Sequence, residues 1–471
     1  MKIKGKNILK TICATALAAI MLTGYASPGV GAAEIGTDTA TGAYVSDDNI
    51  SETFGNFEYT DNGDSITITG YRTLSTEIIV PPKINGKPVT EIASGAFKDC
   101  IDLLNISLPY SLTKIGDWAF SHCIKLKNIW IPDSVTYIGS YVFDSCTELA
   151  IIEVDENNKS YSSEDGVLFN KNKSKLLRYP EGKTGSYIIP ETNIGSYTIP
   201  DSVTEICGRA FSNCTGLTNV VIPDSVTQIR EWAFLGCAKL KSITIPDSVT
   251  EILEFAFKNC TSLTSIVIPD SVTDIGNSIF DYCTGLTSVT IGKSVRAIPN
   301  GAFENCTSLE KVTIHTGVKD IWGSAFKNCT SLTSIAIPDS VTNIGSSVFE
   351  NCTKLKSITI PDGVREIGWH AFYSCKNLTI YGYKSSYAET YANENDIPFV
   401  ALDANVKIGD VNLDGVIDVS DATFIQMSVV DLIELSDEAK TNADVNHDGI
   451  IDVTDATLIQ MFTANLIDSF E

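Results

Sequence analysis

The chain is 471 residues long, is 43% hydrophobic and carries a formal net charge of −24. This length can bury a large core and still supply one or two smaller modules. Nucleic acids and anionic membranes reward clustered Lys and Arg, so the acidic balance argues against both as partners. It suits a soluble extracellular protein.

The first 33 residues have the features of a secretory signal peptide. Four lysines within the first ten residues precede an apolar run at about 12–22, and small residues follow up to Ala33. The run is too short for a membrane span. We expect cleavage after Ala33, with Ala26 as the alternative, and a secreted protein without direct membrane insertion. A lipid anchor would need a cysteine where Tyr25 stands.

Two short segments precede the main body of the chain. Residues 34–53 are rich in Thr, Ser, Asp and Gly, which predicts a flexible leader. Residues 54–90 alternate polar and apolar positions around the turn signal DNGD, which predicts a short N-terminal β cap. Such a cap would cover the strand edge and apolar face of the first repeat.

A 23-residue unit, typified by IPDSVTEILEFAFKNCTSLTSIV at 245–267, recurs over residues 91–378. Each of eleven copies places Cys three residues after Phe, and Leu three residues after Cys. The phenylalanines are Phe97, Phe120, Phe143, Phe211, Phe234, Phe257, Phe280, Phe303, Phe326, Phe349 and Phe372. A fixed period of this length predicts a β-rich solenoid whose coils bury a core by stacking.

The alternation in LTSIVIP, residues 263–269, predicts a short strand stacked in parallel on its neighbours. Proline, Asp and Ser then turn the chain, and a second short strand is expected from Val272. Between Cys146 and Cys214 the Phe and Cys columns are lost, so residues 155–200 are expected to form irregular coils or hairpins. Residues 379–404 are expected to form a cap of one helix and a final strand, with a linker.

Several residue types invite a chemical interpretation that their pattern does not support. The eleven column cysteines are odd in number and would point in parallel, so we expect buried free thiols. Cys207 stands outside the column and is a candidate for exposure. The aspartates after the repeat prolines are read as turn residues. The histidines share no column, and HExxH, nucleophile-elbow and phosphate-loop motifs are missing, so no catalytic residue is assigned and no enzyme is expected.

The outward strand positions are mostly Ser, Thr and Asn, which gives a neutral face whose hydroxyl groups could serve ligand binding or simply favour strand formation. Trp130 is the one large aromatic residue expected there and is a possible ligand-binding residue. The other tryptophans lie in the non-strand half of their coils, where packing is at least as good an explanation as recognition. They are Trp118, Trp232, Trp322 and Trp369.

Residues 405–471 contain two loops, DVNLDGVIDVSD at 410–421 and DVNHDGIIDVTD at 444–455. Each loop is followed by a segment predicted to form an amphipathic helix, at 422–435 and 456–470. Oxygen ligands at loop positions 1, 3, 5, 9 and 12, glycine at 6 and a backbone carbonyl at 7 are the pattern that wraps Ca²⁺. We therefore expect two calcium ions. The expected ligands are Asp410, Asn412, Asp414, Val416, Asp418 and Asp421, and Asp444, Asn446, Asp448, Ile450, Asp452 and Asp455.

The motif LxxIxIPxxVTxIGxxAFxNCTx, over residues 54–401, resembles the BspA-like bacterial leucine-rich repeat. The resemblance implies a curved extracellular scaffold of parallel strands that binds ligands and has no chemistry of its own. The duplicated calcium loops resemble a type I dockerin, a small all-α module of two F-hand-like loop–helix units that binds a cohesin on a scaffoldin. Dockerins commonly carry Asp at position 12, where an ordinary EF-hand has Glu.

The dockerin resemblance also implies a set of cohesin-facing residues. They are Val419, Ser420, Gln426 and Met427 in the first half, and Val453, Thr454, Gln460 and Met461 in the second. The two sets nearly match, which implies docking in either of two orientations.

Three functions follow as hypotheses. In the first, the protein is secreted, monomeric and non-catalytic, and its solenoid binds an unidentified protein or glycan ligand. The dockerin joins it to a cellulosome-type complex through a cell-attached scaffoldin. The second is a surface adhesin for host or bacterial proteins. The third is an enzyme or accessory module of plant cell-wall degradation.

Overall fold

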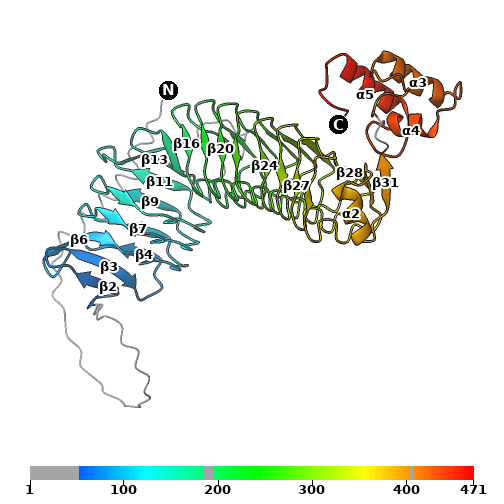
Figure 1. The fold of residues 1–471 in the computed structure, drawn as a ribbon. Coiled ribbons are helices and arrows are strands. Elements are labelled where there is room, and N and C mark those ends of the chain that lie inside the picture. The colour runs from blue at the N-terminus through cyan, green and yellow to red at the C-terminus, as the bar shows by residue number, and fades with distance from the viewer. Residues whose placement is uncertain (1–51, 184–194, 403–406, 471) are drawn as a thin grey trace, which may run out of the picture.

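The computed structural model describes residues 52–183, 195–402 and 407–470. The predicted signal peptide 1–33 and residues 34–51 of the leader lie outside these ranges, as do 184–194 of the irregular coils and 403–406 of the linker. Stacked coils form a long curved body, and a small helical module of residues 407–470 follows at its C-terminal end (Figure 1).

The N-terminal end is built from antiparallel strands that pass directly into the stack. Strands β1 (Glu52–Phe54), β2 (Phe57–Asp61) and β3 (Ile66–Tyr71) pair antiparallel, and β5 (Lys83–Ile84) pairs antiparallel with β6 (Lys87–Ile92). β3 pairs in parallel with β6, which continues in parallel to the next coil. Parallel stacking therefore begins inside the segment that the sequence assigns to a cap.

One row of strands contains the LTSIVIP segments, and its outward side is called the strand face below. Register advances by one repeat per strand, as in Ser265 opposite Ser288 and Ser288 opposite Lys311. The row contains β4 (Glu77–Ile79), β7 (Asn105–Ser107), β9 (Asn128–Ile131), β11 (Ile151–Val154), β15 (Ser196–Thr198), β17 (Asn219–Val221), β19 (Ser242–Thr244), β21 (Ser265–Ile268), β23 (Ser288–Ile291), β25 (Lys311–Ile314) and β28 (Ser357–Thr359).

A second row of two-residue strands follows the proline turns, and in the representative coil it begins at Asp274, two residues later than the sequence predicts. Its ladder is interrupted between β22 and β24. Pro299 lies at this point, and proline has no N–H to donate. The row contains β8 (Lys114–Ile115), β10 (Tyr137–Ile138), β16 (Glu205–Ile206), β18 (Gln228–Ile229), β20 (Glu251–Ile252), β22 (Asp274–Ile275), β24 (Ala297–Ile298), β26 (Asp320–Ile321), β27 (Asn343–Ile344) and β29 (Glu366–Ile367).

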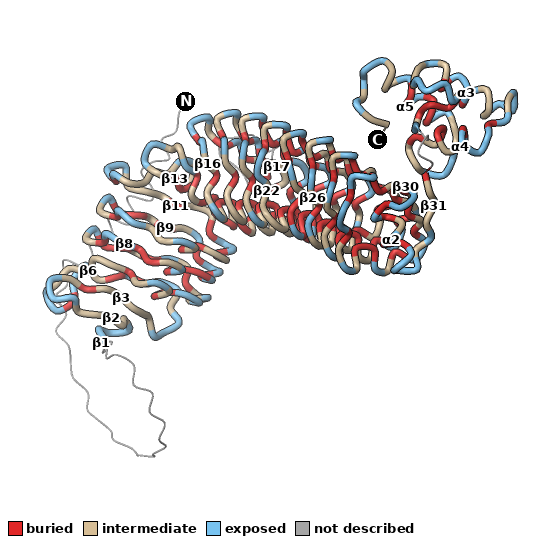
Figure 2. Tube along the Cα trace, viewed as in Figure 1, coloured by how far each residue is buried: buried red, intermediate tan, exposed pale blue. Residues whose placement is uncertain are grey.

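The Phe and Cys columns lie in the core, which Figure 2 shows as buried positions running along the coils. From Phe211 to Phe372 successive rings stack 4.8–5.5 Å apart. The described cysteines are free thiols, as expected. Most column thiols donate to the carbonyl oxygen of the Phe one coil earlier, at 3.1–3.3 Å. Cys207 is half-buried.

Each regular coil also contains two residues in the left-handed region, one on either side of the core Phe. The second stands just before Cys and is often Asn, as at Asn305, Asn328 and Asn351, with φ of 62–63°. Asparagine tolerates this conformation better than most residues. Asn328 Nδ2 donates to Asn305 Oδ1 at 2.8 Å, and Asn351 repeats the bond to Asn328 at 2.9 Å. These bonds link the turns of neighbouring coils.

The irregular segment contains β12 (Tyr161–Glu164), β13 (Val167–Asn170) and β14 (Lys175–Arg178), which pair antiparallel before β14 joins the second row at β16. Alternation along β13 divides the core, because Leu168 packs in the N-terminal hydrophobic cluster and Val167 and Phe169 in the C-terminal one. Buried Arg178 and Glu181 form an ion pair at this junction.

The C-terminal end of the stack has the helix and the strand expected there. β30 (Thr379–Tyr383) pairs in parallel with β28 and with β31 (Phe399–Leu402). Helix α2 (Tyr387–Glu394) lies between them and is N-capped by Ser386. Tyr391 packs edge to face on Phe372, which closes the end of the Phe column.

Candidate docking module and ligand surfaces

The C-terminal module consists of α3 (Val419–Val429), α4 (Asp437–Ala443) and α5 (Val453–Thr463) around a small apolar core. The helix predicted within residues 422–435 ends at Val429, and the one predicted within 456–470 ends at Thr463. Both begin earlier than predicted, because Asp418 and Asp452 cap them and fix their first turns.

The two predicted calcium loops share most of their internal hydrogen bonds. At position 1, Asp410 Oδ2 accepts from Gly415 N at 2.8 Å, and Asp444 Oδ2 accepts from Gly449 N at 3.0 Å. Both glycines have φ above +80°, which favours glycine. Positions 3 and 5 repeat too, since Asn412 and Asn446 accept from the position-5 amide at 2.9 Å. Backbone amides thus hold the loop side chains in corresponding places.

The carboxylates at position 12 close the loops. Asp421 Oδ1 accepts from Val411 N at 2.7 Å and Asn412 N at 3.0 Å, and its Oδ2 accepts from Asp418 N at 2.9 Å. Asp455 makes the corresponding three bonds at 3.0–3.3 Å. Each Asp therefore joins the two ends of its loop and completes a capping box on the following helix.

One buried oxygen atom in the first loop bears on whether these residues could bind a cation. Asp410 Oδ1 is buried without a hydrogen-bond partner among the described residues. Hard oxygens of this kind are the ligands that Ca²⁺ takes. Within the described ranges no three His, Cys, Asp or Glu side chains already converge as a metal site. The donor set and the orphaned oxygen fit calcium, and the position-12 carboxylates are engaged with amides.

The position-9 aspartates differ in environment from two other aspartates of the second loop, at positions 1 and 12. The hydroxyl of Ser420 holds the pKa of Asp418 below its usual value, and Thr454 does the same for Asp452. Desolvation by burial raises the pKa of Asp444 and of Asp455. Removing several carboxylates from water is unfavourable unless a counter-charge compensates.

The residues predicted to face a cohesin lie at and after the start of α3 and α5. Val419 and Val453 are 63% and 60% exposed. Gln426, Gln460 and Thr454 are exposed, and Ser420, Met427 and Met461 are half-buried. The matching residues of the two halves thus have similar exposure, apart from Ser420 and Thr454.

Sequence reasoning missed helix α4 and two contacts of the module. Ser436 caps α4, and the acidic first turn of SDEAK is a signal that could have found it. The fully buried Asn442 on α4 donates to the carbonyl of Asp410 at 2.5 Å, so this helix supports the first loop. Phe470 packs over Gly409, where a Cβ atom would meet the ring at 2.5 Å. Neither contact can be predicted from the spacing of residues in the sequence.

The module also contacts the strand face of the solenoid. Ser357 Oγ, in β28, donates to the carbonyl oxygen of His447 in the second loop at 2.9 Å. Burial lowers the pKa of His447. This is a contact between segments 90 residues apart in the chain.

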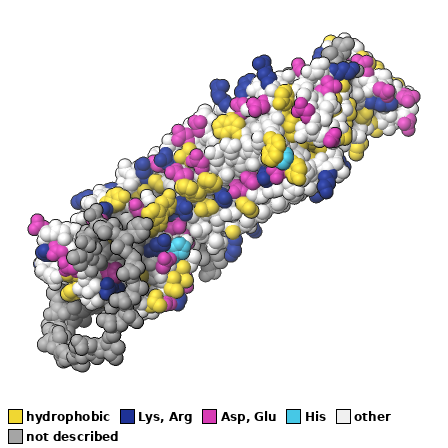
Figure 3. All heavy atoms as spheres, turned by 60° about the horizontal axis from the view of Figure 1, so that its bottom comes forward, with side chains coloured by type: hydrophobic (Ala, Val, Ile, Leu, Met, Phe, Trp, Pro, Cys, Tyr) yellow, Lys and Arg dark blue, Asp and Glu magenta, His cyan; other side chains and the backbone are white. Residues whose placement is uncertain are grey.

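On the strand face, Trp130 is half-buried, with its ring edge to face with Tyr110 at 5.2 Å. Tyr110 is 59% exposed and was not predicted. A groove of about 890 Å³ runs over β19, β21 and β23 and reaches His315. In Figure 3 charges of both signs are interspersed on the face in view, and hydrophobic side chains gather between them.

The comparisons with known proteins agree with this architecture. The model of the BspA type leucine rich repeat region matches residues 71–181, 182–310 and 273–394, and that of the dockerin type I domain matches 408–462. No curated protein matches significantly. No helix within the described ranges is long and apolar enough to cross a bilayer.

Solved structures of bacterial leucine-rich repeat proteins are similar to this chain. One from Bacteroides ovatus is 29% identical, with 75% of this chain and 100% of the other covered and a TM-score of 0.47. A leucine rich cell surface protein from Faecalibacterium prausnitzii is 28% identical, with coverage of 74% and 98% and a TM-score of 0.47. One from Eubacterium ventriosum is 26% identical, with coverage of 63% and 93% and a TM-score of 0.49. The chain belongs to the BspA type leucine-rich repeat family and ends in a type I dockerin domain.

Proposed function

We propose that this protein is a secreted, non-catalytic binding protein, and that its dockerin attaches the solenoid to a scaffoldin cohesin in the presence of calcium. The leucine-rich repeat and dockerin domains are non-catalytic modules. The observation that carries the proposal is the duplication inside the module. Two loops share their ligands and hydrogen bonds, and each presents an exposed valine at the start of its helix.

The proposal assigns one calcium ion to each loop. When bound, calcium would neutralise the loop carboxylates and so favour the folded module. The first ion would be held by Asp410, Asn412, Asp414, Asp418, Asp421 and the carbonyl of Val416. The second would be held by Asp444, Asn446, Asp448, Asp452, Asp455 and the carbonyl of Ile450. Asn442 would fix the first loop through the carbonyl of Asp410.

The near identity of the two halves supports two docking orientations. Val419, Gln426 and Met427 correspond to Val453, Gln460 and Met461, and only Ser420 and Thr454 differ in the predicted contact set. A cohesin that binds one half through shape complementarity and hydrogen bonds can bind the other half after the module is rotated by half a turn. Removing one half is therefore expected to leave binding in place, and removing both is expected to abolish it.

Calorimetric titration of the full chain against a panel of type I cohesin modules tests the proposal. We expect tight binding with calcium that excess EDTA abolishes. Changing Val419 and Gln426 to Asp is expected to reduce affinity only slightly, because the second orientation remains, and the same changes at Val453 and Gln460 should have an equally small effect. Combining all four is expected to abolish it.

Two outcomes would contradict the proposal. If no cohesin binds although calcium stabilises the module, the calcium loops serve only to stabilise the fold of the module. If loss of one half alone abolishes binding, there is a single docking orientation. Secretion is tested separately, because N-terminal sequencing of the exported protein should begin at Glu34 if cleavage follows Ala33.

A further inference from the structure

The last regular coil differs from the other ten at its surface. Trp369 stands three residues before the core Phe, where every other coil has a small or polar residue. Tyr373 follows the core Phe, where no other coil has an aromatic residue. The residues that correspond to Trp369 are Ser94, Asp117, Ser140, Gly208, Glu231, Glu254, Asn277, Asn300, Gly323 and Ser346. The other ten coils stack without aromatic residues at these two positions, so the stacking of the coils does not require these rings.

These aromatic side chains are exposed. Trp369 is 73% exposed and Tyr373 is 56% exposed, so folding gains little from either. Both rings stack on His370, within 16° of parallel. His370 itself has a φ of +59°, in the left-handed region where the two preceding coils have Ser. Every regular coil has a left-handed residue at this position, so the distinguishing feature is the exposed aromatic stack, which is typical of recognition surfaces.

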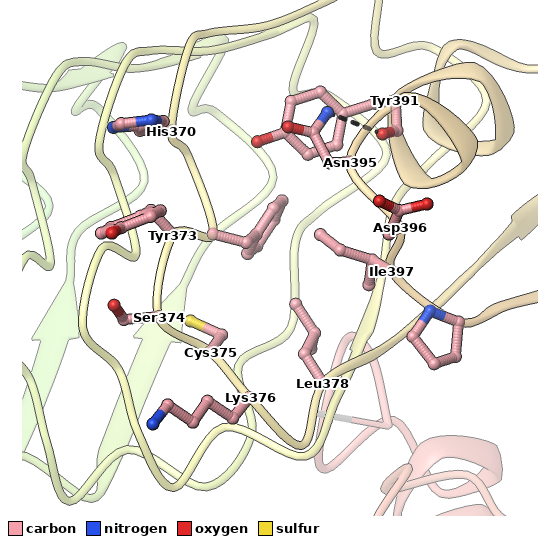
Figure 4. Close-up of a pocket in the computed structure, with 12 residues that line it drawn as sticks. His370, Tyr373, Ser374, Cys375, Lys376, Leu378, Tyr391, Asn395, Asp396 and Ile397 are labelled. Atoms are coloured by element: carbon pink, nitrogen blue, oxygen red, sulfur yellow. Dashed lines mark hydrogen bonds between the residues drawn. The ribbon is translucent and has the colours of Figure 1, made fainter.

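The stack borders a pocket of about 250 Å³ between the last coil and the C-terminal cap. Figure 4 shows His370, Tyr373 and Lys376 along one side of this space, and Asn395 and Asp396 on the other. Phe372 and Leu378 belong to the core and line it as well. The pocket therefore combines an apolar lining with polar and aromatic side chains at its rim.

The rim indicates the chemistry of the ligand. Its charged residues are one cation, Lys376, and one anion, Asp396, so a neutral ligand is favoured. Drug-sized ligands fill pockets of about 300–1,000 Å³, so this volume suits a single ring. A pyranose has an apolar C–H face that stacks on aromatic rings, and hydroxyl groups that need partners such as Asn395 and Asp396.

We propose that the pocket and its aromatic stack bind one neutral pyranose ring at the end of a glycan chain. This inference rests on the proposed role of the solenoid as the ligand-binding part of the protein, and it does not depend on the dockerin. Trp369 and Tyr373 supply the aromatic surface. Lys376, Asn395 and Asp396 supply hydrogen bonds.

The full chain is tested on an array of neutral oligosaccharides and of peptides, and the glycans bound are then titrated by calorimetry. The double variant W369S/Y373E carries the residues of the preceding coil, Ser346 and Glu350, so its melting temperature should stay unchanged. We expect its affinity to fall at least tenfold. The methyl glycoside of the terminal sugar should compete with the glycan.

The matched control is W322G, in the coil two before the last, which replaces a tryptophan at a position where the following coil has Gly345. Its glycan affinity should equal that of the wild type. The inference is overturned if no neutral glycan binds, if W369S/Y373E binds as well as the wild type, or if only peptides bind. Cohesin affinity is measured on the same variants. If the protein binds glycan but no cohesin, the docking proposal is contradicted and the glycan-binding inference is not.

Discussion

At the scale of single residues, the column cysteines are packing groups with a specific hydrogen bond. Cys283 donates to the carbonyl of Phe257 at 3.1 Å, in the space that a larger side chain would overfill. Burial raises the pKa of Cys283 to about 12, and that of Cys237 also to about 12. A thiol in this environment stays protonated near neutral pH and is a poor nucleophile.

These thiols predict a loss of stability in alkali. In the unfolded chain they ionise near their ordinary pKa of about 8.5, and in the folded chain only near 12, so the stabilisation they provide is lost as the pH rises between these values. The melting temperature of the solenoid should fall from pH 8 to pH 11. The fall should be smaller in C237A/C283A. An equal pH dependence in both proteins would contradict this assignment.

At the scale of elements, the irregular segment joins two parts of the core through buried charges. Arg178 donates to Arg209 O at 2.6 Å and Phe143 O at 3.1 Å, and pairs with Glu181. Glu181 also accepts from Ser145 N at 2.8 Å. The ion pair thereby links the coils on both sides of the junction, where the Phe and Cys columns are interrupted.

Removing one partner of this pair should be costly. Arg178→Met leaves the Glu181 carboxylate buried without its cation, and we expect a loss of about 3–5 kcal/mol at pH 7. Desolvation by burial already raises the pKa of Glu181, so the loss should be smaller near pH 4, where the carboxyl is protonated. Urea denaturation checks both values. R178M/E181L should recover most of the stability, and the interpretation fails if it is as unstable as the single variant.

The Phe column gives a second prediction at this scale. Phe303 is fully buried and stacks on Phe280 and Phe326 at 5.4 Å, so it has a ring on each side. Phe303→Ala should cost about 3–5 kcal/mol, because a large cavity remains inside a repeat whose coils contact only their neighbours. Thermal and urea denaturation measure it. Phe54→Ala, at a 45% exposed position, is the control and should change stability little.

At the scale of the whole molecule, the chain combines two parts whose stability depends on different forces. The solenoid buries long apolar columns, whereas the dockerin has a core of few residues and two acidic loops. A module this small gains much of its stability from bound metal. The two parts should therefore unfold separately.

Chelation should reveal this division. With excess EDTA we expect the helical signal of residues 407–470 to be lost at a lower temperature, since a ligand that binds only the folded state stabilises it, and EDTA removes that ligand. The solenoid transition should stay in place. Calorimetry and circular dichroism with calcium and with EDTA measure both. A single transition that EDTA shifts as a whole would contradict independent unfolding.

Periodicity and ligand spacing are local properties of the chain, so the repeat, its inward and outward positions and the two loops could be predicted from the amino-acid sequence. It also predicted the helix and strand that close the solenoid. The boundaries of the elements were less accurate, since caps such as Asp418 and the parallel pairing of β3 with β6 extend them.

The long-range contacts that complete these parts became visible only in the folded structure. Tyr110 against Trp130, Asn442 beneath the first loop, and the pocket between Tyr373 and Asp396 join residues with no common period. No local sequence pattern predicts these contacts, because they depend on how whole coils and helices pack in space.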